Sequence, residues 1–304
     1  MNRRIVIYAI LMSLAVLLLP SCSMDMRGKG TVHILSVALD YNNESLSPLN
    51  GTINDAVEIG ECLSRIYESK GIPVEKRYML QQGTDISESD PLYPTAWNVF
   101  SAIRDTDVSK EDLFVFFYSG HGDAGVDDEG NYDGTGYLAG AKDGETLYTP
   151  IDMDSLFHTI DSLGCPAVII IDACYSGNTA DNETPVTGWD GLLDGLDLMQ
   201  TSVLTASQPT ELSYVSSTQT EEGETERHSL FTIGVLQALG WRHSSFRGSY
   251  IYIGGQAIWV RGYLAYVPQT MTTEDLENIV MGSWTNSQQT PYFNSTGMKI
   301  RIVP

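Results

Sequence analysis

Continuous apolar runs and stretches of helical periodicity alternate along most of this chain. Apolar runs rich in β-branched and aromatic residues are typical of strands buried on both faces of a parallel sheet. Apolar residues spaced three or four apart are typical of helices that cover such a sheet. The pattern predicts strands at 31–39, 74–80, 113–118, 167–171, 202–206, 250–253 and 298–303, and helices from 54 onward and at 95–103, 151–163, 229–239 and 274–281.

Strands that alternate with helices predict an α/β fold, an α/β/α sandwich with a mainly parallel central sheet. The segments between these elements are rich in Gly, Asn, Asp, Ser and Thr, which favour turns and loops. They predict loops at 40–51, 177–198 and 207–227, and a hairpin-like excursion at 123–139.

The first 22 residues have the pattern of a secretory signal rather than of a folded element. Arg3 and Arg4 precede a short apolar run that ends in Leu-Pro-Ser-Cys22. This ending resembles a bacterial lipobox, which implies cleavage before Cys22 and a lipid on its thiol. Proline two positions before the cysteine departs from the commonest pattern, so an uncleaved anchor is the alternative. Either way, we expect a protein outside the cytoplasm, tethered to a bacterial membrane and facing the periplasm or the cell surface.

After the signal, residues 23–30 form a polar spacer, and we expect one domain over 31–304. The net charge is −22, with 17 basic and 39 acidic residues. Such a charge repels phosphates and argues against a nucleic-acid partner. Four cysteines show no metal-ligand spacing, so the sequence predicts no structural zinc site. Of these, Cys62 and Cys165 either pair or remain buried thiols, and the second state is the more common one.

Two apolar runs end in the same way, each with a small polar turn that carries a reactive side chain. Leu113-Phe-Val-Phe-Phe-Tyr-Ser-Gly leads to His121, and Ala167-Val-Ile-Ile-Ile-Asp-Ala leads to Cys174. Side chains at the carboxyl ends of parallel strands meet at one edge of the sheet. A thiol attacks as a thiolate and therefore needs a base such as an imidazole. The sequence predicts a Cys–His pair at this edge.

The segments Tyr118-Ser-Gly-His-Gly122 and Asp172-Ala-Cys-Tyr-Ser-Gly177 resemble the histidine and cysteine motifs of the caspase/metacaspase family of cysteine peptidases. The resemblance extends to Pro48–Ala56, His228–Ile233 and Gln289–Pro291, and so spans roughly residues 31–300. It implies a caspase–haemoglobinase fold, with a large-subunit-like part at about 31–180 and a small-subunit-like part at about 200–304. No cofactor is implied.

The resemblance also implies roles for individual residues. Cys174 would be the nucleophile and His121 its acid–base partner, with the backbone N–H groups of Gly122 and Cys174 as oxyanion donors. Asp55 and Asp172 match the acids of the metacaspase substrate pocket, and Ser119 would line the same pocket. Two carboxylates would bind a cationic side chain and repel an acidic one. We therefore expect protein or peptide substrates cleaved after Arg or Lys.

Two further expectations concern regulation. No Lys or Arg lies between Lys142 and Arg227. An enzyme specific for basic residues could not cut itself there, so we expect a single-chain active form, with self-cleavage near Arg27 and Lys29 or at Arg227. The acids Asp123, Asp127, Asp128, Glu129 and Asp133 offer oxygen ligands for Ca²⁺, but they do not match an EF-hand loop. A solvated turn is the simpler interpretation, and calcium activation stays open.

The sequence leaves three alternatives open. The first is a catalytically silent caspase-like module used for binding. The second is a clostripain- or gingipain-type peptidase of the same clan. The third, more distant, is a thioesterase or another cysteine hydrolase of different fold.

Overall fold

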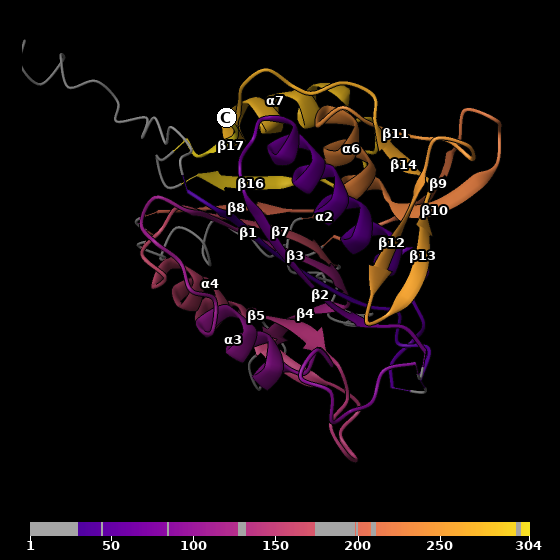
Figure 1. Cartoon of the computed structure of the whole chain (residues 1–304). Coiled ribbons are helices and arrows are strands. Elements are labelled where there is room, and N and C mark those ends of the chain that lie inside the picture. The colour runs from indigo at the N-terminus through magenta and orange to yellow at the C-terminus, as the bar shows by residue number, and fades with distance from the viewer. Residues whose placement is uncertain are drawn as a thin grey trace, which may run out of the picture.

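The computed structural model describes residues 30–43, 45–83, 85–126, 132–173, 198, 200–207, 211–295 and 299–304. Its centre is a six-stranded sheet (Figure 1). In spatial order the strands are β16 (Tyr292–Ser295), β8 (Thr201–Thr205), β7 (Ala167–Ala173), β3 (Leu113–Gly120), β1 (Val32–Leu39) and β2 (Val74–Gln81). The neighbours from β8 to β2 pair in parallel, and β16 is antiparallel to β8. The predicted, mainly parallel sheet is confirmed.

Helices cover both faces of the sheet (Figure 1). On one face lie α3 (Ala96–Arg104) and α4 (Met153–Asp161), and on the other lie α2 (Thr52–Ser69), α6 (Leu230–Ala238) and α7 (Thr273–Ser283). In β3, Phe116 packs in the cluster with α3 and α4, whereas Phe117 packs in the cluster with α2 and α6. Burial on both faces explains why these strands are continuous apolar runs.

Short antiparallel sheets surround this sandwich. They are β4–β5–β6 (Gly122–Val126, Tyr132–Gly140, Thr149–Asp152), β9–β10 (Val215–Gln219, Thr225–Ser229), β11–β14 (Trp241–His243, Gly262–Leu264), β12–β13 (Ser249–Ile253, Gln256–Val260) and β15–β17 (Met271–Thr272, Arg301–Val303). The pair β4 and β5 confirms the hairpin predicted after His121.

Two predicted elements differ from the structure. The helix predicted over 151–163 begins only at Met153, because Asp152 caps its N-terminus by accepting the Ser155 N–H at 2.8 Å. The preceding residues, 149–152, form β6. The polar segment predicted as a loop over 207–227 contains the hairpin of β9 and β10, in whose two strands Val215 is the one apolar residue.

Gly51 permits a close approach that matters for the site. It precedes α2 with φ of 108°, a left-handed conformation that favours glycine. A Cβ atom at this position would lie 2.9 Å from the carbonyl oxygen of Arg227 in β10. The absence of a side chain therefore lets the N-terminus of α2 contact β10, and this brings Asp55 to His228.

Among the residues that the structure describes, no helix combines the length and the apolar character needed to cross a membrane. Residues 1–29, which include the predicted signal and Cys22, lie outside the described residues. The predicted domain boundaries therefore stay predictions.

Candidate active site

The candidate site lies where β3 and β7 end. Their parallel register pairs Ser119 with Asp172 and Gly120 with Ala173. His121 follows Gly120, and Cys174 follows Ala173 in the sequence but lies outside the described residues. The two strands thus end in register, each one residue before a member of the predicted Cys–His pair.

Two tyrosine hydroxyls hold the backbone of His121. The hydroxyl of Tyr41 accepts the His121 N–H at 3.0 Å and donates to the carbonyl of Ala139 at 2.6 Å. The Tyr118 hydroxyl donates to the His121 carbonyl at 2.8 Å. Burial raises the pKa of Tyr41 far above its usual range, so this phenol remains protonated. The backbone of His121 is thereby fixed on both its N–H and its C=O side.

The His121 ring is half-buried and oriented by two contacts. Its Nε2 atom lies 2.7 Å from the carbonyl oxygen of Ser47, and its ring centroid lies 4.7 Å from that of Tyr41. A carbonyl oxygen can only accept, so Nε2 carries the proton. In the neutral ring the lone pair is then on Nδ1, which is the atom able to act as a base.

Asp55 occupies the first turn of α2 and is 1% exposed. One carboxylate oxygen accepts from Nδ1 of His228 at 2.9 Å, and the other accepts from Oγ of Ser119 at 3.2 Å. The backbone N–H of Ser229 lies 3.3 Å from both oxygens. Burial raises the pKa of Asp55, and these partners oppose the rise.

Asp172, the penultimate residue of β7, is 3% exposed. Its carboxylate accepts three hydroxyl donors: Ser213 at 2.8 Å, Thr232 at 2.6 Å, and Ser229. Burial and the nearby charge of Asp55 raise the pKa of Asp172 from 3.8 to about 6, although the hydroxyls act in the opposite direction. The carboxylates of Asp55 and Asp172 therefore interact electrostatically in one buried site, as the resemblance implied.

His228 supplies a positive charge to this site. Burial opposes its protonation, but the hydrogen bond to Asp55 and the charges of Asp55 and Glu58 outweigh burial and raise its pKa to about 10. The imidazole is thus a cation at neutral pH. It compensates Asp55, whereas the partners of Asp172 described above are neutral hydroxyls.

The predicted pocket residues Asp55, Ser119 and Asp172 come together, but the protein's own donors cover both carboxylates. The sequence did not reveal these donors: Ser213, Ser229, Thr232 and His228. Ser229 also caps α6 by accepting the Thr232 N–H. The helix predicted over 229–239 already placed Ser229 at a helix N-terminus, where serine is a common cap. Nothing local in the sequence indicates its contact with Asp172.

Comparison with known proteins identifies the family. A family model of the metacaspase peptidase C14 domain matches residues 33–183. This chain belongs to the caspase/metacaspase family of cysteine peptidases. The matched region contains Asp55, Ser119, His121, Asp172 and Cys174, while His228, Ser229 and Thr232 lie beyond it.

Curated metacaspases are similar to this chain over part of their length. Metacaspase-1A of Aspergillus oryzae is 29% identical over 165 residues, which are 50% of this chain and 36% of that protein. Metacaspase-4 of Arabidopsis thaliana is 31% identical over 142 residues, 44% of this chain and 31% of that protein. The chain thus spans about a third of the length of these relatives.

A solved structure shares the fold. The crystal structure of a protein from Geobacter sulfurreducens aligns with a TM-score of 0.50 at 16% identity. The alignment covers 87% of this chain and 92% of that one. It supports the α/β sandwich that the metacaspase motifs implied.

The remaining predicted site residues have separate locations. Gly122 is the first residue of β4, directly after His121, and Asp123 beside it is exposed. Asp133 belongs to β5, and its side chain is not described. Asp127 and Asp128 lie outside the described residues, as does Glu129. A calcium site at these acids stays a prediction.

The two remaining cysteines are buried free thiols. Cys62 packs in the cluster around α2, and Cys165 packs in the cluster on the opposite face of the sheet. Burial raises the pKa of Cys165 to about 11, and it raises that of Cys62 as well. The prediction of buried thiols is confirmed, and neither thiol is a candidate nucleophile.

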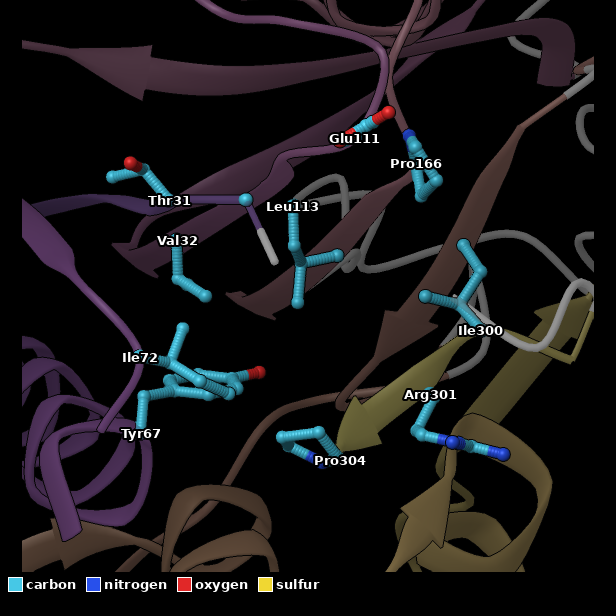
Figure 2. A pocket seen from close by; sticks show the side chains of 11 residues that line it. Thr31, Val32, Tyr67, Ile72, Glu111, Leu113, Pro166, Ile300, Arg301 and Pro304 are labelled. Atoms are coloured by element: carbon cyan, nitrogen blue, oxygen red, sulfur yellow. The ribbon is translucent and has the colours of Figure 1, made fainter. Parts of the chain in front are cut away.

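A separate pocket lies at the opposite edge of the sheet (Figure 2). Val32 and Leu113, which line it, begin β1 and β3, and Tyr67 and Ile72 close one side. His121 follows the other end of β3. This pocket is therefore remote from the candidate active site.

Proposed function

We propose that this protein is an endopeptidase in which Cys174 attacks the scissile peptide bond and His121 transfers protons. The observation that carries the proposal is the pairing of Gly120 with Ala173 in the parallel strands β3 and β7. Parallel strands that end in register present their next residues at the same edge. The metacaspase family match supports the same assignment.

The chemistry follows from the groups at this edge. Nδ1 of His121 accepts the thiol proton, and the thiolate adds to the carbonyl carbon of the substrate. The backbone N–H groups of Gly122 and Cys174 stabilise the resulting oxyanion. The imidazolium then protonates the leaving amine as the C–N bond breaks, and water hydrolyses the thioester.

We further propose that the residue before the cleaved bond is Arg or Lys. Asp172 and Asp55 are two acids in one buried site, and Asp172 has neutral donors only among its contacts given above. A guanidinium or ammonium group would relieve the repulsion between the two carboxylates. An Asp side chain in the same place would add a third negative charge.

Substrate binding in this proposal requires exchange of hydrogen bonds at Asp172. The hydroxyls of Ser229 and Thr232 are buried, whereas Ser213 is only partly buried. Ser213 also comes from a loop rather than from a helix or strand. We therefore infer that the hydrogen bond from Ser213 to Asp172 is the first to break when a cationic side chain enters.

Covalent labelling tests the proposed function. An acyloxymethyl ketone with a terminal Arg is expected to label the wild type on Cys174, found by peptide mass spectrometry, and not to label Cys174→Ala. Hydrolysis of fluorogenic peptides that end in Arg or Lys is expected to exceed that of a matched Asp peptide. Labelling in both proteins would contradict the role of Cys174, and preference for the Asp peptide would contradict the specificity.

We also propose that the domain acts outside the cytoplasm from a lipid anchor on Cys22, on protein substrates with basic residues. The basic and apolar pattern before Cys22 supports this assignment. Expression of the full chain in a bacterial host should place it in the membrane fraction. Cys22→Ala should lose incorporation of labelled fatty acid, and unchanged incorporation would contradict the assignment.

A further inference from the structure

A second cluster of titratable side chains adjoins Asp55 through His228. It consists of Glu58 from α2, Glu226 and His228 from β10, and His243 from β11. One donor atom from each residue lies within 4.8 Å of the others. Three side chains are buried, and that of Glu226 is 13% exposed. Three elements, α2, β10 and β11, thus direct nitrogen and oxygen ligand atoms to one small volume.

The geometry of this cluster centres on the carboxylate of Glu58. Its Oε2 atom lies 2.6 Å from Nε2 of His243 and 3.8 Å from Nε2 of His228. The same nitrogen of His228 lies 3.8 Å from Oε2 of Glu226. In a tetrahedral zinc site, ligand bonds of about 2.0–2.2 Å separate neighbouring donors by roughly 3.3–3.6 Å. The His228 distances are near that range, and the Glu58–His243 contact would open by less than about 1 Å.

His228 provides an independent indication of a missing ligand. Its side chain is completely buried, and its Nε2 atom has no hydrogen-bond partner. Oε2 of Glu226, which faces this nitrogen, also has none. Buried polar atoms are nearly always paired, and an unpaired one costs about 1–3 kcal/mol. This nitrogen and this carboxylate oxygen face each other at 3.8 Å, so both could be satisfied as ligands of one shared cation.

We propose that Glu58, Glu226, His228 and His243 form a binding site for one Zn²⁺ ion. Two imidazoles and two carboxylates match the nitrogen and oxygen ligands that Zn²⁺ takes in a four-coordinate site. Ca²⁺ and Mg²⁺ prefer oxygen ligands alone, so the two imidazoles disfavour them. Cysteine spacing gave no indication of this site, because none of its ligands is a cysteine.

The groups around the cluster orient its ligands in the way metal sites require. Nδ1 of His228 is bonded to Asp55 at 2.9 Å, which leaves Nε2 directed at the cluster. Zn²⁺ would displace the proton that Nε2 carries in the metal-free imidazolium, and the ion would then supply the positive charge beside Asp55. Glu58 is held by the Trp241 indole N–H at 2.8 Å and by the Gly262 N–H at 3.1 Å. A carboxylate behind a metal-bound histidine fixes its tautomer and increases its basicity. Asp55 has this position relative to His228.

A bound ion would connect α2 in the first part of the chain to β10 and β11 in the second. His228 precedes Ser229, which touches both Asp55 and Asp172. The ion would thus stabilise the segment that covers the two acids. The site itself rests on contacts independent of Cys174 and of any peptidase activity.

Zinc titration of a thiol-depleted full chain tests the site. Accessible thiols also bind zinc, so the parent protein carries Cys22→Ser and Cys174→Ala and is first freed of metal with a chelator. Calorimetry should give one Zn²⁺ per chain, and Mg²⁺ should give no binding. Glu226→Gln should weaken Zn²⁺ at least about tenfold. Glu224→Gln, on the same hairpin but outside the cluster, should bind as the parent does.

A second measurement needs no variant in the cluster. Co²⁺ added to the metal-free parent should give the intense visible bands of a four-coordinate ion, and Zn²⁺ should abolish them. Zn²⁺ should also raise the Tm of the parent and of Glu224→Gln, but raise that of Glu226→Gln much less at the same concentration. No stoichiometric Zn²⁺, a six-coordinate Co²⁺ spectrum, or undiminished affinity in Glu226→Gln would each overturn the proposal.

Discussion

His228 and Asp55 form a buried ion pair, with Nδ1 of the imidazole 2.9 Å from the carboxylate oxygen. Asp55 therefore already has a cationic partner inside the protein. Asp172 is held by the hydroxyls of Ser213, Ser229 and Thr232. The two acids of the proposed substrate pocket are thus unequal, and Asp172 has the greater need of an external cation.

This inequality predicts that Asp172 dominates the preference for Arg. Asp172→Asn should lower kcat/KM for an Arg peptide by about 10- to 100-fold, because one charge-assisted hydrogen bond of about 1.5–3 kcal/mol is lost. A matched citrulline peptide, neutral but similar in shape, should be hydrolysed equally by both proteins. Asp55→Asn, which leaves buried His228 without its partner, should lower the Tm more than Asp172→Asn does. Equal loss for both peptides would show that Asp172 acts on structure rather than on specificity.

The pKa of Asp172, raised to about 6 by burial and by the charge of Asp55, predicts a pH-dependent preference. Below about pH 6 the carboxylate gains a proton and no longer attracts a cation. The ratio of kcat/KM for Arg and citrulline peptides should therefore fall as pH decreases from 7 to 5. Taking the ratio removes pH effects on the catalytic step, because both peptides share that step. A ratio that stays constant over this range would contradict the role of Asp172.

The raised pKa of Asp172 predicts that the stability of the fold decreases as pH rises. An acid in a salt bridge has the opposite effect, because its pKa is lowered. Between pH 3.8 and about 6, Asp172 holds a proton in the folded protein that the unfolded chain has released. Its contribution to the free energy of unfolding therefore decreases as pH rises through this window, by about 3 kcal/mol in total. Relative to the wild type, Asp172→Asn should become more stable between pH 4 and pH 7. Denaturant unfolding at both pH values measures the difference, and a relative loss of stability would contradict it.

The hydroxyl of Tyr118 is predicted to position His121 without touching substrate. Tyr118→Phe removes the donor to the His121 carbonyl and a partner of Tyr41. We expect kcat to fall by about 10- to 100-fold with little change in KM, because the proton-transfer geometry loosens while the substrate pocket is intact. Tyr250→Phe, an exposed tyrosine, is the matched control. A change confined to KM would argue against a positioning role.

The distribution of basic residues predicts an active single chain. No Lys or Arg occurs between Lys142 and Arg227. Arg227 itself lies in β10, where it pairs with Ser217. Intact mass spectrometry of active wild type and of Cys174→Ala should show continuous chain over 143–226 in both. An activating cut within that range, present only in the wild type, would contradict the proposed specificity.

The sequence predicted the sheet and the candidate pair because both depend on local patterns. The apolar runs before His121 and Cys174 indicated buried parallel strands, and the structure places those strands next to each other in register. The pairing of Asp55 with Asp172 came from the metacaspase resemblance. The covering donors could not be predicted, because Ser213 and Ser229 are ordinary polar residues whose partners lie 41 and 57 positions away in the chain. The hairpin of β9 and β10 was missed because its strands are almost entirely polar, although His228 and Ser229 at the end of β10 are buried.

The contact between the N-terminus of α2 and β10, made at Gly51, has an evolutionary consequence. The strands that carry the proposed catalytic machinery and the hairpin that covers the acids come from separate stretches of the chain. Substitutions in β10 and at the start of α6 could therefore change which side chain is accepted without altering the ends of β3 and β7. Related proteins could diversify their targets in this way while retaining one chemistry.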